Sequence, residues 1–223
     1  MCTKSKLSRS FIGSVVLFAL ILIISQEIYS QSVLSGFGVE VGGGHNQLFW
    51  QGNYFSYIPI DADRTNLSFT PTIRVNYQWY IMQNVSLIPF TGYNQFGGKD
   101  KQPNGYQDQY WFDALECGAL GMYSFNNYSV GVGIKANYHL KVTGRWLGTF
   151  AQGVSANDVW DEGDISNWFT KWSSDAGVRV SYKYEHYSIS LESWFGITEL
   201  QAGLISEATI RENQFRILIG YTL

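Results

Sequence analysis

One short segment of the sequence has the residue types of a hydrolytic active site. His186, Tyr187 and Ser188 place an imidazole two residues from a hydroxyl, and two carboxylates, Glu192 and Glu199, follow in the sequence. A hydroxyl nucleophile, an imidazole base and an orienting carboxylate are the parts of an acyl hydrolase. The pattern is short enough to occur by chance, so its meaning depends on where the surrounding elements place it.

The other candidates for chemistry are weaker. His139 has no serine beside it, and His45 has no evident partner. Carboxylates that could hold a divalent cation gather around Gly163, and they are Asp158, Asp161, Glu162 and Asp164. Ca²⁺ binds carboxylate and carbonyl oxygens, but the spacing is not that of an EF-hand. A solvated loop is therefore the better interpretation of these acids, and no catalytic, cofactor or metal site is predicted.

The residues around these candidates follow a strand pattern. From Tyr128 to Val142, every even position carries an apolar side chain and no odd position does. A period of two predicts a β-strand with one apolar face and one polar face. The segment is longer than the usual strand of about five or six residues, and a strand that crosses a bilayer at a tilt needs about 9–11. We therefore expect one strand of a transmembrane β-barrel.

Residues 1–30 are predicted to be a secretory signal peptide, because basic residues precede a short apolar run, Phe11–Ile24, and a small-residue cleavage site. Its removal takes Cys2 away and leaves Cys117 alone, so no internal disulfide is expected. No later stretch is apolar enough for a spanning helix, and the formal net charge of −3, without a basic patch, does not suggest nucleic acid. Residues 31–223 are predicted to form one outer-membrane barrel domain.

Further segments alternate in the same way and bring the predicted strands to eight. They are 33–44, 67–80, 85–96, 110–125, 128–142, 168–184, 187–197 and 213–223. The register of 85–96 stays open, because apolar residues fall on both faces. Short turns, such as Asn126-Asn127 and Glu185-His186, alternate with longer loops. The predicted fold is all-β: an eight-stranded antiparallel up-and-down transmembrane β-barrel with short periplasmic turns and longer extracellular loops.

Aromatic residues gather at both ends of these strands. The predicted periplasmic girdle consists of Tyr77, Trp79, Tyr123, Phe125, Tyr128, Tyr182, Tyr184, Tyr187 and Tyr221. The opposite girdle consists of Phe69, Tyr93, Tyr110, Trp111, Tyr138, Trp172, Phe195 and Phe215. Both membrane interfaces favour such belts. A soluble, lipocalin-like barrel with an apolar interior is the alternative, but it gives no reason for the belts or for charged strand faces.

With its signal peptide, eight amphipathic strands and a final strand ending in Tyr221-Thr222-Leu223, the chain resembles small outer-membrane barrels of the OmpA and OmpX type. It is especially similar to the porin-like outer membrane protein β-barrel domain group that includes PorT-like proteins. The resemblance covers about residues 31–223 and has no diagnostic motif. It implies an outer-membrane location, contact with outer-membrane lipid and insertion by the barrel-assembly machinery. Such barrels commonly end in Phe, whereas this chain ends in Leu223.

The polar strand faces are predicted to fill the lumen, because eight strands enclose just enough room for side chains. Counting from the turns places Arg179 opposite Glu192 and Glu116 one diagonal step from Lys135. The full predicted lumen network is Glu40, Arg74, Glu116, Lys135, Lys141, Asp175, Arg179, Lys183, Glu192 and Arg216. Both signs of charge are present, as a buried network requires. A side-chain-filled lumen is favoured over an ion or proton path.

This topology argues against the hydrolase. Some eight-stranded outer-membrane barrels are lipid A deacylases with a His-x-Ser pair, but His186 would lie in a periplasmic turn, away from the outer leaflet. The leading prediction is a non-enzymatic outer-membrane barrel with a structural or surface-interaction role. A PorT-like component of a secretion or envelope-assembly system is the alternative. Protein partners are expected at loops 45–66 and 143–167, whose aromatic residues either form a contact surface or pack over the barrel mouth.

Overall fold

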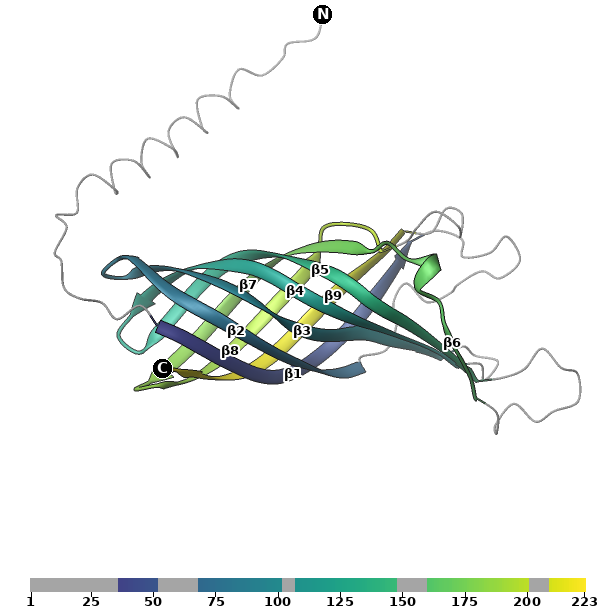
Figure 1. The fold of residues 1–223 in the computed structure, drawn as a ribbon, viewed down its shortest axis with the longest axis horizontal. Coiled ribbons are helices and arrows are strands. Elements are labelled where there is room, and N and C mark those ends of the chain that lie inside the picture. The colour runs from purple at the N-terminus through teal and green to yellow at the C-terminus, as the bar shows by residue number, and fades with distance from the viewer. Residues whose placement is uncertain (1–35, 52–67, 102–106, 148–159, 201–208) are drawn as a thin grey trace, which may run out of the picture. The chain divides into compact units, whose positions relative to one another are not determined.

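The computed structural model describes residues 36–51, 68–101, 107–147, 160–200 and 209–223. These residues form a closed antiparallel β-barrel (Figure 1). Its strands are β1 (Gly36–Gln51), β2 (Ser68–Met82), β3 (Val85–Lys101), β4 (Gln107–Phe125), β5 (Tyr128–Leu147), β6 (Trp160–Asp164), β7 (Trp172–Tyr184), β8 (Tyr187–Gly196) and β9 (Thr209–Thr222). No helix among the described residues is long and apolar enough to cross a membrane. The signal peptide predicted for residues 1–30 lies outside the described residues.

The barrel wall consists of eight strands, and the ninth numbered strand, β6, is a short addition at its edge. Apart from the short β6, each strand pairs with the next one along the chain, and β1 pairs with β9 to close the circle. The short β6 pairs with the outer end of β5, and a 3-10 turn at Ser166–Trp168 leads on to β7, which pairs with the inner part of β5. Two-residue turns follow β4 and β7, and Asn126 and Glu185 in these turns have left-handed φ angles of 52° and 53°. The predicted fold class is therefore confirmed.

A β-bulge changes the register of β5 near its extracellular end. Asp113 pairs with Lys141, but the next residue of β4, Ala114, pairs with His139, so Leu140 is the extra residue. One inserted residue reverses the faces of every residue beyond it. Lys141 was predicted to lie in the lumen and is instead exposed on the outer face, while Val142 points inward and is buried. The prediction for Lys141 is wrong because it assumed that the alternation of faces continues through Leu140.

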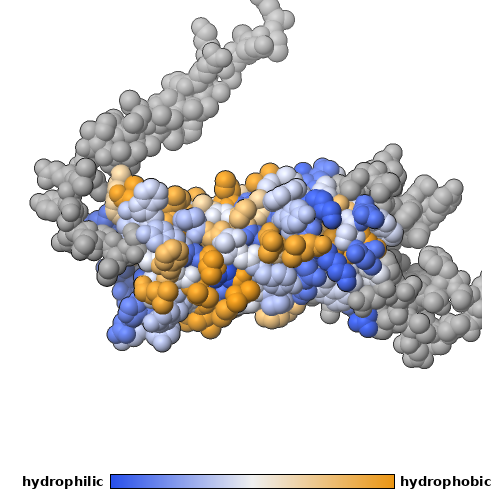
Figure 2. Space-filling model, in the orientation of Figure 1, coloured by the Kyte–Doolittle hydropathy of each residue, from blue (hydrophilic) through white to orange (hydrophobic). Residues whose placement is uncertain are grey.

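The outer face of the barrel carries a belt of exposed apolar side chains (Figure 2). Val132, Ile134 and Ile219 in this belt are each more than half exposed. Aromatic rings border the belt: Tyr128 and Tyr182 lie 5.1 Å apart at the periplasmic end, and other residues of the predicted periplasmic girdle are exposed beside them. Such a belt would be very costly in water, since burial of one large apolar side chain is worth about 1.5–3 kcal/mol.

At the extracellular end, the outer aromatic border includes Tyr138 and Trp172, whose rings lie 4.8 Å apart. Tyr110 does not belong to it. It was expected in this border, but its side chain is buried inside the barrel, because it shares the inward face of β4 with Phe112 and Glu116. β3 also has a defined register, with Ile88 and Phe90 pointing inward. The sequence left this register open because Leu87 and Tyr93 make the outer face equally apolar.

Candidate functional site

The centre of the lumen contains a ring of ion pairs between neighbouring and opposite strands. Glu40 on β1 faces Arg74 on β2, and the Arg74 Nε lies 2.5 Å from the Glu40 Oε2. Arg74 also reaches across the lumen to Glu192 on β8, with Nη2 at 2.5 Å from Oε1. Arg179 on β7 pairs with Glu192 at 3.2 Å and with Glu40. Two guanidinium groups and two carboxylates thus alternate in charge around one level of the barrel.

A second group of charges lies beside this ring. The Lys135 Nζ is 3.2 Å from the Glu116 Oε2 and 3.3 Å from the Asp175 Oδ2. The Arg216 Nη1 is 2.9 Å from the same Glu116 oxygen. Arg74 joins the two groups, because its Nη1 lies 4.0 Å from the other Glu116 oxygen. The structure therefore places eight of the ten residues predicted for the lumen in one connected network, without Lys141 and Lys183.

Aromatic rings support the cations from the side. The Arg74 guanidinium carbon lies 4.5 Å from the centre of the Phe90 ring, and the Lys135 Nζ lies 5.2 Å from the centre of the Trp194 ring. Trp194 is completely buried, and its indole N–H donates a hydrogen bond to the Glu192 Oε2 at 2.8 Å. A cation over a ring face gains stabilisation that grows when water is excluded. The network therefore fills the middle of the lumen with packed side chains joined by ion pairs and hydrogen bonds.

Several residues of the interior were missed by the sequence patterns. Glu212 was placed in a loop, but β9 begins at Thr209, so Glu212 and Gln214 share the inward face of Arg216. Asn137 on β5 donates to the Asp175 Oδ2 at 2.9 Å and to the Glu212 Oε1 at 3.1 Å. Extending the alternation of the last strand backwards by two residues finds Glu212. Asn137 already lay on the polar face of its strand but carries no charge, so charge alone did not mark it.

Towards the extracellular end, the interior changes from charged to apolar. The apolar plug consists of the buried residues Leu48, Phe96, Tyr110, Phe112, Ala114, Val142, Ile165, Phe169, Leu200 and Ile210. The rings of Phe96 and Phe112 stack at 4.8 Å, and Phe169 packs on the edge of Phe112 at 4.9 Å. Trp168 also packs against the plug. For Trp168, the structure thus shows packing over the barrel mouth, whereas loop residues 52–66 and 148–159 lie outside the described residues.

The residues of the hydrolase candidate that the sequence disfavoured do not come together. His186 lies in the turn after β7, where its Nδ1 is 2.9 Å from the Thr222 carbonyl oxygen. Ser188 lines the lumen, and its hydroxyl group forms no hydrogen bond with a described residue. Glu192 is held by Arg74 and Arg179 in the ion-pair ring. The candidate triad is therefore divided among a turn, an inner face and a buried ion pair.

A different histidine does contact a serine, and both side chains lie in the interior of the barrel. The His139 Nε2 lies 3.1 Å from the Ser173 Oγ, and its Nδ1 lies 2.6 Å from the Thr170 carbonyl oxygen. Both side chains are buried, and His139 packs edge-on against Phe96 and Phe112 of the apolar plug. The pair therefore joins the charged network to the apolar plug.

Among the four loop acids, the structure describes the side chain of Asp164, and this side chain has a structural role. The Asp164 carboxylate accepts hydrogen bonds from the Ser166 N–H at 2.9 Å and from its hydroxyl at 2.5 Å. These bonds favour the ionised form and lower the pKa of Asp164. Within the described part of the chain, no group of three or more His, Cys, Asp or Glu side chains is arranged to hold a metal ion. Asp158 lies outside it.

A closed barrel with an apolar outer belt, aromatic borders and a polar interior defines an integral outer-membrane β-barrel protein. Its strands satisfy their backbone hydrogen bonds around the circle, which is the condition for crossing lipid. The outer face therefore contacts membrane lipid, and the protein resides in the outer membrane of the cell.

No protein-family model matches the chain, and no curated protein is similar enough in sequence to be a relative. Solved structures with a similar fold include Ail, the attachment invasion locus protein of Yersinia pestis, with 10% identity over 85% of this chain and 100% of that one and a TM-score of 0.47. Neisserial surface protein A gives 12% identity over 85% and 98%, with a TM-score of 0.48. The outer membrane protease OmpT from Escherichia coli gives 8% identity over 86% and 99%, with a TM-score of 0.43.

Proposed function

We propose that the protein is a non-conducting, non-enzymatic outer-membrane barrel whose role is structural or is carried out by its extracellular surface. The observation that supports this proposal is the occupied lumen. Arg74 and Glu192 bond to each other across the barrel at mid-height, and Phe96 and Phe112 stack further out. Because all these side chains are buried, water and ions have no continuous path along this axis.

Planar bilayers test the closed lumen directly. The purified protein, folded in detergent and inserted into a bilayer, should give no stable single-channel current, while an open porin measured in the same bilayer provides the positive control. Heat-modifiable mobility on gels verifies that the sample is folded. Stable, large unitary currents from the folded protein would refute the proposal of a filled lumen.

The extracellular ends of the strands support the proposal of a surface role. At this end of the barrel, β3 extends to Lys101, β4 begins at Gln107 and β5 extends to Leu147. The short β6 adds a further strand beside β5. Parts of the predicted loops 45–66 and 143–167 lie in strands, namely 45–51 in β1, 143–147 in β5 and 160–164 in β6. These strand ends would hold the rest of both loops for a protein partner. A photo-crosslinker at Phe49 should give discrete products in native membranes that are absent with the crosslinker at Tyr182. Equal products at both positions, or none at Phe49, would contradict a partner at this surface.

A further inference from the structure

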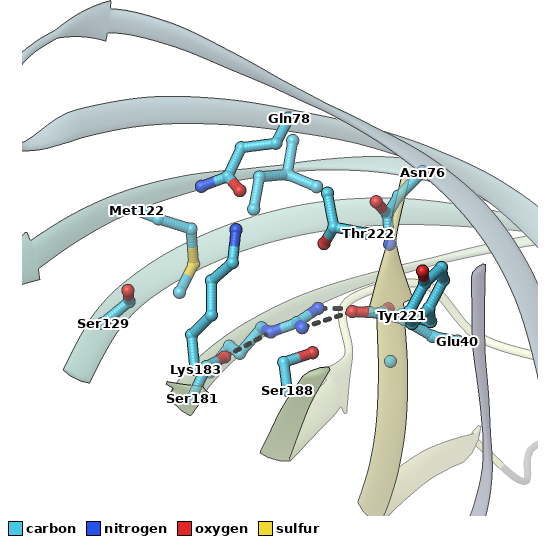
Figure 3. Close-up of a pocket in the computed structure, with 13 residues that line it drawn as sticks. Glu40, Asn76, Gln78, Met122, Ser129, Ser181, Lys183, Ser188, Tyr221 and Thr222 are labelled. Atoms are coloured by element: carbon cyan, nitrogen blue, oxygen red, sulfur yellow. Dashed lines mark hydrogen bonds and ion pairs between the residues drawn. The ribbon is translucent and has the colours of Figure 1, made fainter. Parts of the chain in front are cut away.

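A pocket remains in the lumen at its periplasmic end, below the ion-pair ring. It has a volume of about 50 Å³. Its polar lining includes Asn76, Gln78, Ser129, Lys183, Ser188 and Thr222 (Figure 3). The pocket exists because small side chains and Gly220 replace the large charged residues found higher in the barrel. It therefore has room for about four groups of the size of water.

The charged residues at the inner end of this pocket, next to the ion-pair ring, already have partners for their charges and hydrogen bonds. Arg179 donates from Nε to the Ser181 hydroxyl at 2.8 Å, from Nη1 to Glu40 and Glu192 at 3.3 and 3.2 Å, and from Nη2 to Glu40 and to Ser190. These bonds occupy all five N–H donors of a guanidinium group. Glu40, the carboxylate among the lining residues, is paired with Arg179 and with Arg74. The inner end of the pocket therefore offers neither a free cation nor a free anion.

Lys183 is different. Its half-buried side chain extends into the pocket in the direction of Gln78 (Figure 3), yet its ammonium group has no ion pair or hydrogen bond with any described residue. The side chains of Asn76, Ser188 and Thr222 also line the pocket without a partner in the described part of the chain. An ammonium group has three donors and no acceptor, and each hydroxyl and amide adds further donors. The pocket thus presents one uncompensated positive charge among unused donors.

We propose that this periplasmic pocket binds a small oxyanion, namely a phosphate or carboxylate group, with the Lys183 ammonium supplying the charge and Asn76, Ser188 and Thr222 supplying hydrogen bonds. Charge-assisted hydrogen bonds to an oxyanion are stronger than neutral ones. The pocket volume suits the charged head of a solute or of a periplasmic chain end. The site is independent of the proposed closed lumen, since the ion-pair ring lies between it and the extracellular end.

Titration with inorganic phosphate, followed by the methyl resonances of the methionines, tests this site. Met122 lines the pocket, whereas Met82 does not and serves as an internal reference. In the folded protein, the Met122 signal should shift and saturate with phosphate while the Met82 signal stays in place. Acetate and sulfate at equal ionic strength distinguish a preference for carboxylate from one for phosphate. A saturable response to any of the three supports an oxyanion site.

Lys183→Gln should weaken this binding at least tenfold, whereas Lys171→Gln, which changes an exposed lysine outside the pocket, should leave it unchanged. Ser188→Ala with Thr222→Val should weaken binding by a smaller factor and keeps the proposal testable if the first variant does not fold. Three results would overturn the proposal: no saturable shift in the wild type, the same affinity after Lys183→Gln, or an equal response to sodium chloride alone.

Discussion

Arg74 contacts three carboxylates, and its side chain is shielded from bulk solvent. It lies 2.5 Å from both Glu40 and Glu192 and 4.0 Å from Glu116, and its side chain is fully buried. A buried charge is tolerated only when partners compensate for the hydration that it loses. Removal of this one cation leaves Glu40 and Glu192 with Arg179 as their remaining shared partner. The stability of the lumen is therefore expected to depend on Arg74 more than on any exposed charge.

Arg74→Met should lower the free energy of unfolding by about 3–5 kcal/mol, the range for breaking a buried ion pair by removal of one partner. Urea unfolding in lipid vesicles, followed by tryptophan fluorescence, measures the change. Lys171→Met, at an exposed position, is the matched control and should change stability by less than about 1 kcal/mol. Addition of Glu192→Gln to Arg74→Met should recover part of the loss. Purely additive losses would show that the two charges do not compensate each other.

The outward position of Lys141 can be tested by labelling. In a Cys117→Ala background, Lys141→Cys should react with a membrane-impermeant maleimide on intact cells, because the bulge at Leu140 turns position 141 outward near the extracellular end. Val142→Cys should be protected at least tenfold, because this position is buried in the apolar plug. The reverse order of reactivity would mean that the alternation continues unbroken and that Lys141 points into the lumen.

At the scale of elements, the turn after β7 contains a residue in an unfavourable backbone conformation. Glu185 has a φ of 53°, in the left-handed region where a residue with a side chain is disfavoured by about 1–2 kcal/mol and where Asn is better tolerated. The side chain of Glu185 is exposed and bonds to no described residue, so its replacement removes no contact. Glu185→Asn should therefore raise the free energy of unfolding by about 0.5–1 kcal/mol.

Urea unfolding in lipid vesicles also measures this change. Asn126 has the same left-handed conformation in the turn after β4, and it provides the opposite test. Asn126→Ala should lower stability by about 1 kcal/mol, because alanine has no side-chain amide to support this backbone conformation. A loss of stability in Glu185→Asn would show that the glutamate has a role in the turn beyond its backbone angle.

The elements that the sequence predicted well lie inside the membrane belt. β5 begins at Tyr128 and β8 at Tyr187, as predicted, because lipid on one side and a polar lumen on the other impose alternation on every strand. Near the extracellular end this constraint is lost. Residues 97–109, which separate the predicted strands 85–96 and 110–125, contain the ends of β3 and β4, and the bulge in β5 has no signature in residue type. Strand ends were therefore predicted less well than turns.

The candidate site shows the same division. Counting from a turn identifies neighbours on adjacent strands, and the structure has Arg179 opposite Glu192 and Lys135 diagonal to Glu116. Counting from a turn cannot identify the contact between Arg74 and Glu192, because β2 and β8 are not adjacent in the barrel wall. Such contacts depend on the diameter of the barrel and on the reach of long side chains. The pocket was missed for the same reason, since it results from small residues on several strands.

At the scale of the whole molecule, two successive layers of side chains with different chemistry close the lumen. The ion-pair ring at mid-height excludes ions because its own charges are matched, and the apolar plug excludes them because it offers no hydration. His139 lies at the boundary, where it contacts Ser173 on one side and Phe112 on the other. Each layer should be sufficient to block conduction. The two layers differ in what they contribute to stability and in how their loss would be observed.

Phe112→Ala should therefore destabilise the barrel without opening it. Loss of a buried phenylalanine costs about 3–5 kcal/mol, and Phe112 is fully buried between Phe96 and Phe169. Planar-bilayer recordings of this variant should remain silent, because Arg74 and Glu192 still block the lumen at mid-height. Arg74→Ala alone should also remain silent, behind the intact plug. The double variant is expected to give unitary currents, and currents from either single variant would show that one layer alone closes the barrel.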